Sequence, residues 1–134
     1  LPQIGLSVSF GTLWMSSFFE NAPQELIDAA TIDGCNRWKA LWLILWPLAK
    51  PATTTLVVLI FMWTWNEFLL ALVMVQTEAM RTLPVGLAFF QGKYTSSLSL
   101  MAAGAIIVAL PTILIYILFQ RFFIRGMLGG AIKG

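Results

Sequence analysis

The longest uncharged stretch of the sequence places the strongest limit on the fold. Its apolar part runs from Leu98 to Phe119, reads LSLMAAGAIIVALPTILIYILF, and is followed after one glutamine by Arg121 and then by Arg125. An apolar segment of about 20 residues is long enough for an α-helix to cross the hydrocarbon core of a bilayer. Only segments that satisfy their own backbone hydrogen bonds are stable in that core. The stretch therefore predicts a helical membrane protein.

Two further segments are predicted to cross the membrane. Residues 52–76 are apolar apart from threonines, one glutamine, one asparagine and one glutamate, and extend roughly 35 Å as a helix. Residues 1–19 contain glycine, serine and glutamine but no charge before Glu20. Because this apolar segment starts abruptly, we interpret it as the remaining part of a third span in a larger subunit. The expected fold is all-α, a polytopic membrane bundle with spans at about 1–19, 52–76 and 98–120.

The composition narrows the classes of function. Of the 134 residues, 59% are hydrophobic and 10% are charged, and the net charge of +2 is too small to indicate nucleic-acid binding. There is no histidine, and Cys35 is the single cysteine. The commonest metal ligand and the usual general base are therefore missing from this sequence. We expect the lipid bilayer as the surroundings, and no enzymatic chemistry, metal or cofactor.

The basic residues predict the orientation in the membrane. Six of the eight lie in residues 20–51 and 121–134, against Arg81 and Lys93 in residues 77–97. Short loops rich in lysine and arginine stay in the cytoplasm. The loop 20–51 and the tail 121–134 are therefore predicted to be cytoplasmic, and the loop 77–97 external. The glycine-rich part of the tail from Gly126 is predicted to be flexible.

The loop at residues 20–51 predicts a folded element. Asn21 is a candidate N-cap, Pro23 suits a first helical turn, and Glu25 is an acid where the helix dipole favours one. The helix is expected to end at Gly34, because glycine adopts the positive φ of a helix C-terminus without steric cost.

Small and acidic residues share this first helix. Asp28 stands beside Ala29 and Ala30, a flat acidic surface. Such a surface suits docking into a groove on a cytoplasmic partner. It equally suits a helix face that is only solvated, and the pattern alone favours neither interpretation.

A second helix is predicted to begin near Asn36. Its tryptophans are spaced four apart and are expected to share one face: Trp38, Trp42 and Trp46. Arg37 and Lys39 are expected to point elsewhere. The row favours anchoring at the membrane interface or packing over ligand stacking. Pro47 and Pro51 are expected to bracket a turn into the next span.

The polar residues inside the 52–76 span form a candidate site. An ionisable group within a membrane helix is costly and is by default a functional candidate. In a continuous helix Trp63, Asn66, Glu67 and Leu70 share one face by spacings of three and four. Trp63, Asn66 and Glu67 therefore form a candidate translocation pathway. The alternative is that Glu67 bonds a neighbouring helix or lies near the outer interface.

The sequence resembles the permeases of binding-protein-dependent ABC importers. The segment Asp28-Ala29-Ala30-x-x-x-Gly34, nine residues and then Ile44-x-Trp46-Pro47 is similar to their E-A-A-x-x-x-G-x(9)-I-x-L-P loop. Further segments resemble the carbohydrate branch, in particular the second permease subunit of maltose-like importers: Pro23-x-Glu25-Leu26, Trp65-Asn66-Glu67-Phe68, Arg81-Thr82-Leu83-Pro84-Val85-Gly86-Leu87 and Gly130-Ala131-Ile132-Lys133-Gly134. Asp28 and Trp46 depart from the usual glutamate and leucine.

The resemblance implies a role and partners. The full subunit would have about six spans, and this chain would hold the last three. Its partners would be a cytoplasmic ABC ATPase dimer, a second permease subunit and an extracytoplasmic solute-binding protein in a bacterial or archaeal cytoplasmic membrane. The implied ATPase-coupling loop holds Glu25, Asp28, Ala29, Ala30, Gly34 and Pro47. No Walker loop occurs in the sequence, so ATP hydrolysis would belong to another chain. The alternative is a polytopic membrane scaffold that transports nothing.

Overall fold

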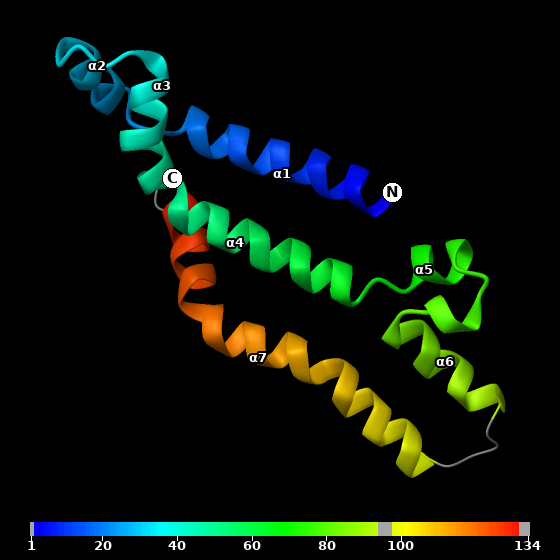
Figure 1. The fold of residues 1–134 in the computed structure, drawn as a ribbon. Helices are drawn as coiled ribbons and strands as arrows, with labels where there is room; N and C mark the ends of the chain where they lie inside the picture. The colour runs from blue at the N-terminus through cyan, green and yellow to red at the C-terminus, as the bar shows by residue number, and fades with distance from the viewer. Residues whose placement is uncertain (1, 94–97, 132–134) are drawn as a thin grey trace. The chain divides into compact units, whose positions relative to one another are not determined.

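The regular elements of the chain are helices. The structure is a computed structural model that describes residues 2–93 and 98–131, with the side chains of residues 2–88 and 98–122. Its elements are α1 (Pro2–Glu20), α2 (Gln24–Ile32), α3 (Arg37–Ala40), the π-helix η1 (Leu41–Leu45), α4 (Trp46–Trp65), α5 (Leu69–Met74), the 3-10 helix η2 (Glu78–Met80), α6 (Leu83–Lys93) and α7 (Leu98–Ala131) (Figure 1). No strand occurs among the described residues, and the predicted all-α class is confirmed.

Two segments of the described chain are long and apolar enough to cross a membrane. They are Arg37–Trp65, with 29 residues, and Leu98–Phe122, with 25 residues. The first segment joins α3, η1 and α4 into one helix, which begins and ends earlier than the predicted span 52–76. Helix α1 covers residues 2–19 of the first predicted span but is not one of these two segments.

The prolines at the start of α4 lie inside a helix, where a turn was predicted. The π-helix directly before them changes the bonding pattern, because the N–H of Trp46 donates to the carbonyl of Leu41, five residues back. Pro47 follows directly after this wider turn, so the N–H that it lacks falls where the regular bonding pattern is already interrupted. Pro51 remains within α4, as prolines do in membrane helices whose freed backbone groups find other partners.

The last helix extends into the predicted tail. We predicted a flexible segment from Gly126, but α7 continues to Ala131. A glycine costs a helix only about 1 kcal/mol relative to alanine. Adding residues to an existing helix is far easier than starting a new one, since each adds a hydrogen bond without a new nucleus. Residues 94–97 and 132–134 of the predicted external loop and tail lie outside the described residues.

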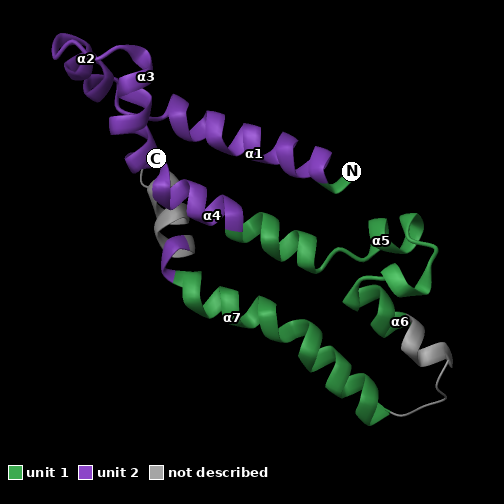
Figure 2. Cartoon of the chain, viewed as in Figure 1, with its two compact units in different colours: residues 1–3, 58–120 green, residues 4–57, 121–134 purple. Residues whose placement is uncertain are grey.

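The chain divides into two compact units (Figure 2). The unit that contains residues 4–57 packs α1 against the first half of α4. The indole N–H of Trp14 donates to the carbonyl of Ala52 at 3.2 Å. A Cβ built on Gly11 would lie 3.7 Å from the side chain of Leu56, so the two helices meet there at van der Waals distance. Ala49 is fully buried.

The other unit contains residues 58–120, with the end of α4, α5, α6 and most of α7. The indole N–H of Trp65 donates to the carbonyl of Val108 at 2.9 Å. A Cβ on Gly104 would lie only 2.9 Å from Leu87 Cδ1, so a residue without a side chain lets α6 approach α7 closely. Val85 is 1% exposed and belongs to the core of this unit.

Candidate functional site

Helix α2 begins without the predicted cap. Pro23 is the residue before the helix, with extended backbone angles and no side-chain cap. Asn21 instead donates from Nδ2 to the carbonyl of Ser17 at 2.8 Å and so satisfies the end of α1. A cap accepts a hydrogen bond from a backbone N–H of the first helical turn, whereas the side chain of Asn21 donates back to α1. The prediction for Asn21 is therefore wrong.

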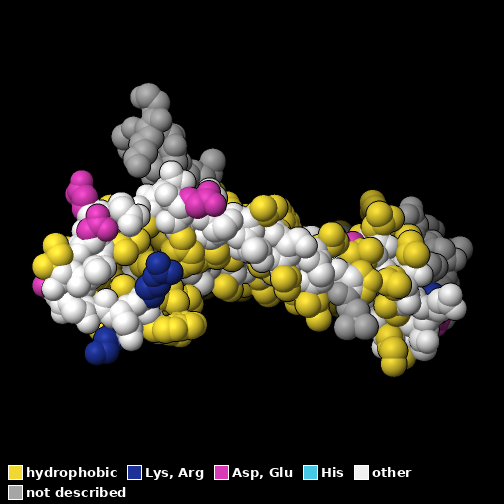
Figure 3. Space-filling view, turned by 90° about the horizontal axis from the view of Figure 1, so that it is seen from above, with side chains coloured by type: hydrophobic (Ala, Val, Ile, Leu, Met, Phe, Trp, Pro, Cys, Tyr) yellow, Lys and Arg dark blue, Asp and Glu magenta, His cyan; other side chains and the backbone are white. Residues whose placement is uncertain are grey.

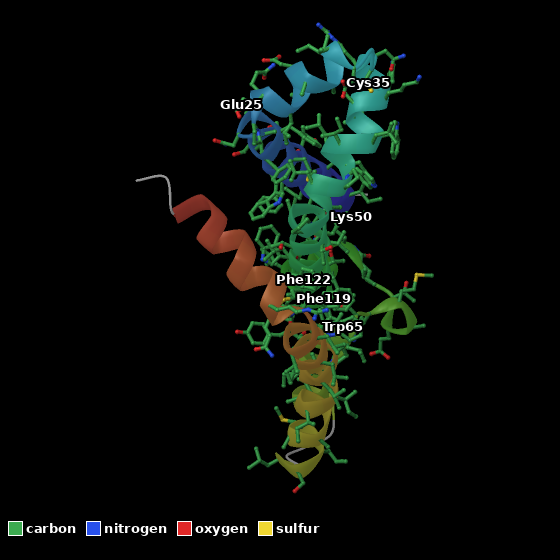
Figure 4. All side chains as sticks on the ribbon, turned by 90° about the vertical axis from the view of Figure 1, so that its left-hand side faces the viewer. Glu25, Cys35, Lys50, Trp65, Phe119 and Phe122 are labelled. Atoms are coloured by element: carbon green, nitrogen blue, oxygen red, sulfur yellow. The ribbon has the colours of Figure 1, made fainter. Side chains whose placement is uncertain are left out.

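Helix α2 ends as the sequence predicted, at a left-handed glycine. Gly34 has a φ of +78°. The N–H of Cys35 donates to the carbonyl of Ala30 at 2.9 Å and the N–H of Gly34 to that of Thr31 at 3.1 Å, which together form a Schellman motif. Figure 4 shows Cys35 at this turn between α2 and α3. The side chain of Asn36 then accepts from the N–H of Lys39 at 2.8 Å, so the predicted start of the next helix is confirmed.

Helix α2 carries one exposed face, which we call the α2 face. It consists of Glu25, Asp28, Ala29 and Ile32, at positions i, i+3, i+4 and i+7 of the helix. All four are exposed, and Figure 4 shows Glu25 projecting outward from the ribbon. Ala30 was predicted to share this face with Ala29, but it is only 3% exposed. Consecutive residues are about 100° apart on a helix, so Ala30 points inward when Ala29 points outward.

The α2 face combines a carboxylate with a large apolar side chain. Asp28 accepts a hydrogen bond from Nε2 of Gln24 at 3.5 Å, the outer limit for such a bond, so its charge is available to a cation on another molecule. Ile32 is 87% exposed and was not among the predicted site residues. Its spacing of four from Asp28 is the signal that identifies it. An exposed carboxylate beside an exposed apolar side chain suits docking into a groove on another protein.

Pro47 is separate from the α2 face. It is exposed and lies in the first turn of α4, on the helix that continues from α3 and η1. The structure therefore connects Pro47 to the Gly34 turn through helical backbone and does not place it in a loop.

The predicted pathway residues lie at a break between two helices. Helix α4 ends at Trp65 and α5 begins at Leu69, so Asn66 and Glu67 are not helical. The prediction that they share a helix face with Trp63 is wrong. Asn66 donates from Nδ2 to the carbonyl of Met62 at 2.7 Å, and a side chain that bonds the backbone in this way competes with helix continuation.

The carboxylate of Glu67 starts the next helix. Its Oε1 accepts from the N–H of Leu70 at 2.9 Å, in the first turn of α5. Asn66 also donates to Oγ1 of Thr112 at 3.3 Å, which ties the break to α7. Glu67 is half-buried, while Trp63 is 52% exposed and Asn66 is exposed. The break thus leaves the side chains of Trp63 and Asn66 at the surface of the described chain. No group of residues that could hold a metal ion occurs among the described residues.

Substitutions at Glu67 should distinguish the effect of the hydrogen bond that its side chain accepts from the Leu70 N–H from the effect of its charge. Glu67→Leu removes the acceptor for the Leu70 N–H, and we expect it to lower the free energy of unfolding by about 1–3 kcal/mol. Glu67→Gln keeps an oxygen acceptor and should cost no more than about 1 kcal/mol. The measurement is equilibrium unfolding of the purified full-length protein in detergent. Equal losses for both variants would contradict the capping role.

Comparison with known proteins finds transport system permease proteins that are similar to this chain. The family described as binding-protein-dependent transport system inner membrane component matches residues 2–128. The sulfoquinovosyl glycerol transport system permease protein of Agrobacterium fabrum is 38% identical over all of this chain and 47% of the relative. A probable starch degradation products transport system permease protein of Thermoanaerobacterium thermosulfurigenes is 37% identical over 97% of this chain and 47% of the relative. The trehalose transport system permease protein of Mycobacterium tuberculosis is 36% identical over all of this chain and 50% of the relative. The chain spans about half the length of these curated relatives, and the matches confirm the resemblance inferred from its motifs.

Proposed function

Because the chain belongs to the family of binding-protein-dependent transport system inner membrane components, we propose that it forms part of the membrane permease of an ATP-driven carbohydrate importer. The relatives transport a sulfoquinovosyl glycerol, starch degradation products and trehalose according to their names, and we extend the shared carbohydrate class to this chain. Its partners are a cytoplasmic ATPase pair, a second permease subunit and an extracytoplasmic solute-binding protein.

The observation that carries the proposal is the α2 face with its attached helix. The exposed Glu25, Asp28 and Ile32 form a surface that fits a groove on another protein. The Gly34 turn follows, and from Arg37 the chain continues as one helix to Trp65. A force on α2 therefore reaches a helix of membrane-crossing length through one turn that is closed by two backbone hydrogen bonds.

The mechanism is mechanical. Glu25, Asp28, Ala29 and Ile32 dock on the ATPase, and Asp28 pairs with a cation there. Closure of the ATPase pair displaces α2, and the helix from Arg37 moves with it as a rigid element. Rigid-body movement of such helices opens a central cavity alternately to the two sides of the membrane. The chain itself makes and breaks no covalent bond.

The same proposal assigns the sides of the membrane. Residues 20–51 and 121–134 hold six of the eight basic residues and belong to the cytoplasmic side of the membrane, while residues 77–97 belong to the outer side. The protein is a multi-pass component of the cytoplasmic membrane of a bacterium or archaeon.

Purification and reconstitution test the function. The affinity-tagged full-length permease should co-purify with an ATPase, and proteoliposomes of the complex should accumulate a carbohydrate only with ATP and the binding protein. A panel of glycosides, oligosaccharides and polyols should identify the substrate. A protein that purifies without an ATPase and supports no uptake would instead be a membrane scaffold.

Glu67 also tests the proposed pathway of Trp63, Asn66 and Glu67. Glu67→Gln keeps the capping oxygen but removes the charge, and we expect uptake to fall about fivefold at normal membrane abundance. This is the factor for about 1 kcal/mol, the difference between a charged and a neutral hydrogen bond. The measurement is initial uptake by proteoliposomes. Unchanged uptake would leave Glu67 with a capping role alone.

A further inference from the structure

A second exposed surface lies on α3 and η1, and the α2 face does not include it. It consists of Arg37, Trp38, Lys39, Trp42 and Trp46, and we call it the Trp–cation surface. Trp38, Trp42 and Trp46 are 72%, 59% and 42% exposed. Basic side chains lie beside hydrophobic ones on the face drawn in Figure 3. Three exposed indoles on one short segment offer both apolar rings and N–H donors to a partner.

The π-helix keeps the indoles in a row. Residues four apart drift around an α-helix, because its turn holds only 3.6 residues. The turn of η1 closes over five residues, from the carbonyl of Leu41 to the N–H of Trp46. This wider turn reduces the drift between Trp42 and Trp46, whose ring centroids lie 5.6 Å apart. The irregular turn thus brings Trp42 and Trp46 together, and with Trp38 four residues earlier they form an aromatic strip along the helix.

Helix length places this strip at the edge of the membrane. The helix Arg37–Trp65 has 29 residues and extends about 43 Å, whereas the hydrocarbon core measures about 30 Å. If Trp65 marks one boundary, the first nine or so residues lie beyond the other, at the headgroups. Tryptophans and basic residues are enriched at this depth. Lys50 lies just inside the boundary, and a lysine stem is long enough to carry its ammonium group back to the interface.

The positive charges of Arg37 and Lys39 favour lipids with anionic headgroups. Arg37 and Lys39 lie about 100° to either side of Trp38 on the helix, so they flank the aromatic strip. Among the described residues, an ion pair joins Arg81 to Glu78. Neither Arg37 nor Lys39 has a carboxylate of a described residue within ion-pair distance. We propose that the Trp–cation surface binds the headgroups of anionic phospholipids, with the two cations on the phosphates and the indoles at the glycerol level. The inference rests on the membrane topology proposed above, and not on transport activity.

Photo-crosslinking on the full-length permease tests this site. A benzophenone amino acid replaces Leu43, which is 68% exposed next to Trp42, and the assembled complex is placed in bilayers of phosphatidylcholine with a minority of phosphatidylglycerol. We expect lipid adducts in which phosphatidylglycerol is enriched about tenfold over its mole fraction, because each cation near the surface attracts anionic lipid. Arg37→Gln with Lys39→Gln should return the adducts to the bulk composition. Arg37→Lys with Lys39→Arg keeps both charges and should preserve the enrichment.

A second position provides the control. Leu13 on α1 is 71% exposed, and its adducts should follow the bulk lipid composition. Phosphatidylglycerol at its mole fraction in the Leu43 adducts would overturn the proposal. Adducts of Leu43 with an ATPase peptide would also overturn it, by assigning the surface to protein docking. No ATP or sugar is needed, so an inactive importer and a failed lipid site give different results.

Discussion

Gly34→Val should stop carbohydrate uptake by the proposed importer and leave the affinity of the binding protein for its sugar unchanged. Gly34 has a φ of +78°, and a β-branched residue in this conformation costs of order 1–3 kcal/mol. The cost arises in the backbone alone, because a Cβ at this position meets nothing within 4 Å. The Schellman bonds from Cys35 and Gly34 would be distorted, so α2 would lose its fixed angle to the helix that begins at Arg37.

A series of substitutions at Gly34 should distinguish the effect of backbone strain from the effect of side-chain size. Gly34→Asn should retain most uptake, because asparagine tolerates the left-handed conformation, and Gly34→Ala should lie between asparagine and valine. Uptake and binding-protein-stimulated ATP hydrolysis, both measured in proteoliposomes, should fall together along this series. Wild-type rates for Gly34→Val in a normally assembled complex would show that the turn does not couple the ATPase to the membrane helices.

The sequence predicts this turn well because its signals are local. A glycine after an apolar helix and an asparagine two residues later are enough to identify the end of α2 and the start of α3, and the structure confirms both at Gly34 and Asn36. Apolar length likewise predicted the helix of membrane-crossing length at Leu98–Phe122, because the bilayer sets that length whatever the tertiary contacts.

The helix break at Asn66 and Glu67 shows where hydrophobic periodicity misleads. The pattern of apolar residues continues through residues 52–76, so it predicts one helix. The outcome depends instead on two polar side chains that bond the backbone, Asn66 to Met62 and Glu67 to Leu70. Capping chemistry outweighed periodicity here, and only Asn and Glu in adjacent positions hint at it.

Two other differences between the sequence predictions and the structure depend on what surrounds the residue. Ala30 is buried while Ala29 is exposed, and two alanines in sequence carry no sign of which one faces the neighbouring segment. Pro47 was expected to bracket a turn together with Pro51, but a π-helix at residues 41–45 precedes it and the helical backbone continues. The sequence shows the proline clearly, whereas the wider turn that accommodates it has no comparable signature.

Asp28→Lys should release the ATPase from the permease. Asp28 is exposed on the α2 face, and within the described residues its carboxylate meets only the side chain of Gln24, at 3.5 Å. Reversal of its charge replaces an attraction across the proposed interface with a repulsion, at a cost of about 2–5 kcal/mol, or more than tenfold in affinity. The measurement is recovery of the ATPase with the affinity-tagged full-length permease, with uptake measured in parallel.

Three variants define what this result means. Asp28→Glu restores the residue that such loops usually carry and should retain the ATPase. Glu20→Lys makes the same charge change at the exposed end of α1, outside the α2 face, and should have little effect. Reversal of the opposing cation on the ATPase should partly rescue Asp28→Lys but not Gly34→Val, because only the first defect is electrostatic. If Asp28→Lys retains the ATPase as well as Glu20→Lys does, the α2 face is not the docking surface, and the exposed Ile32 needs another partner.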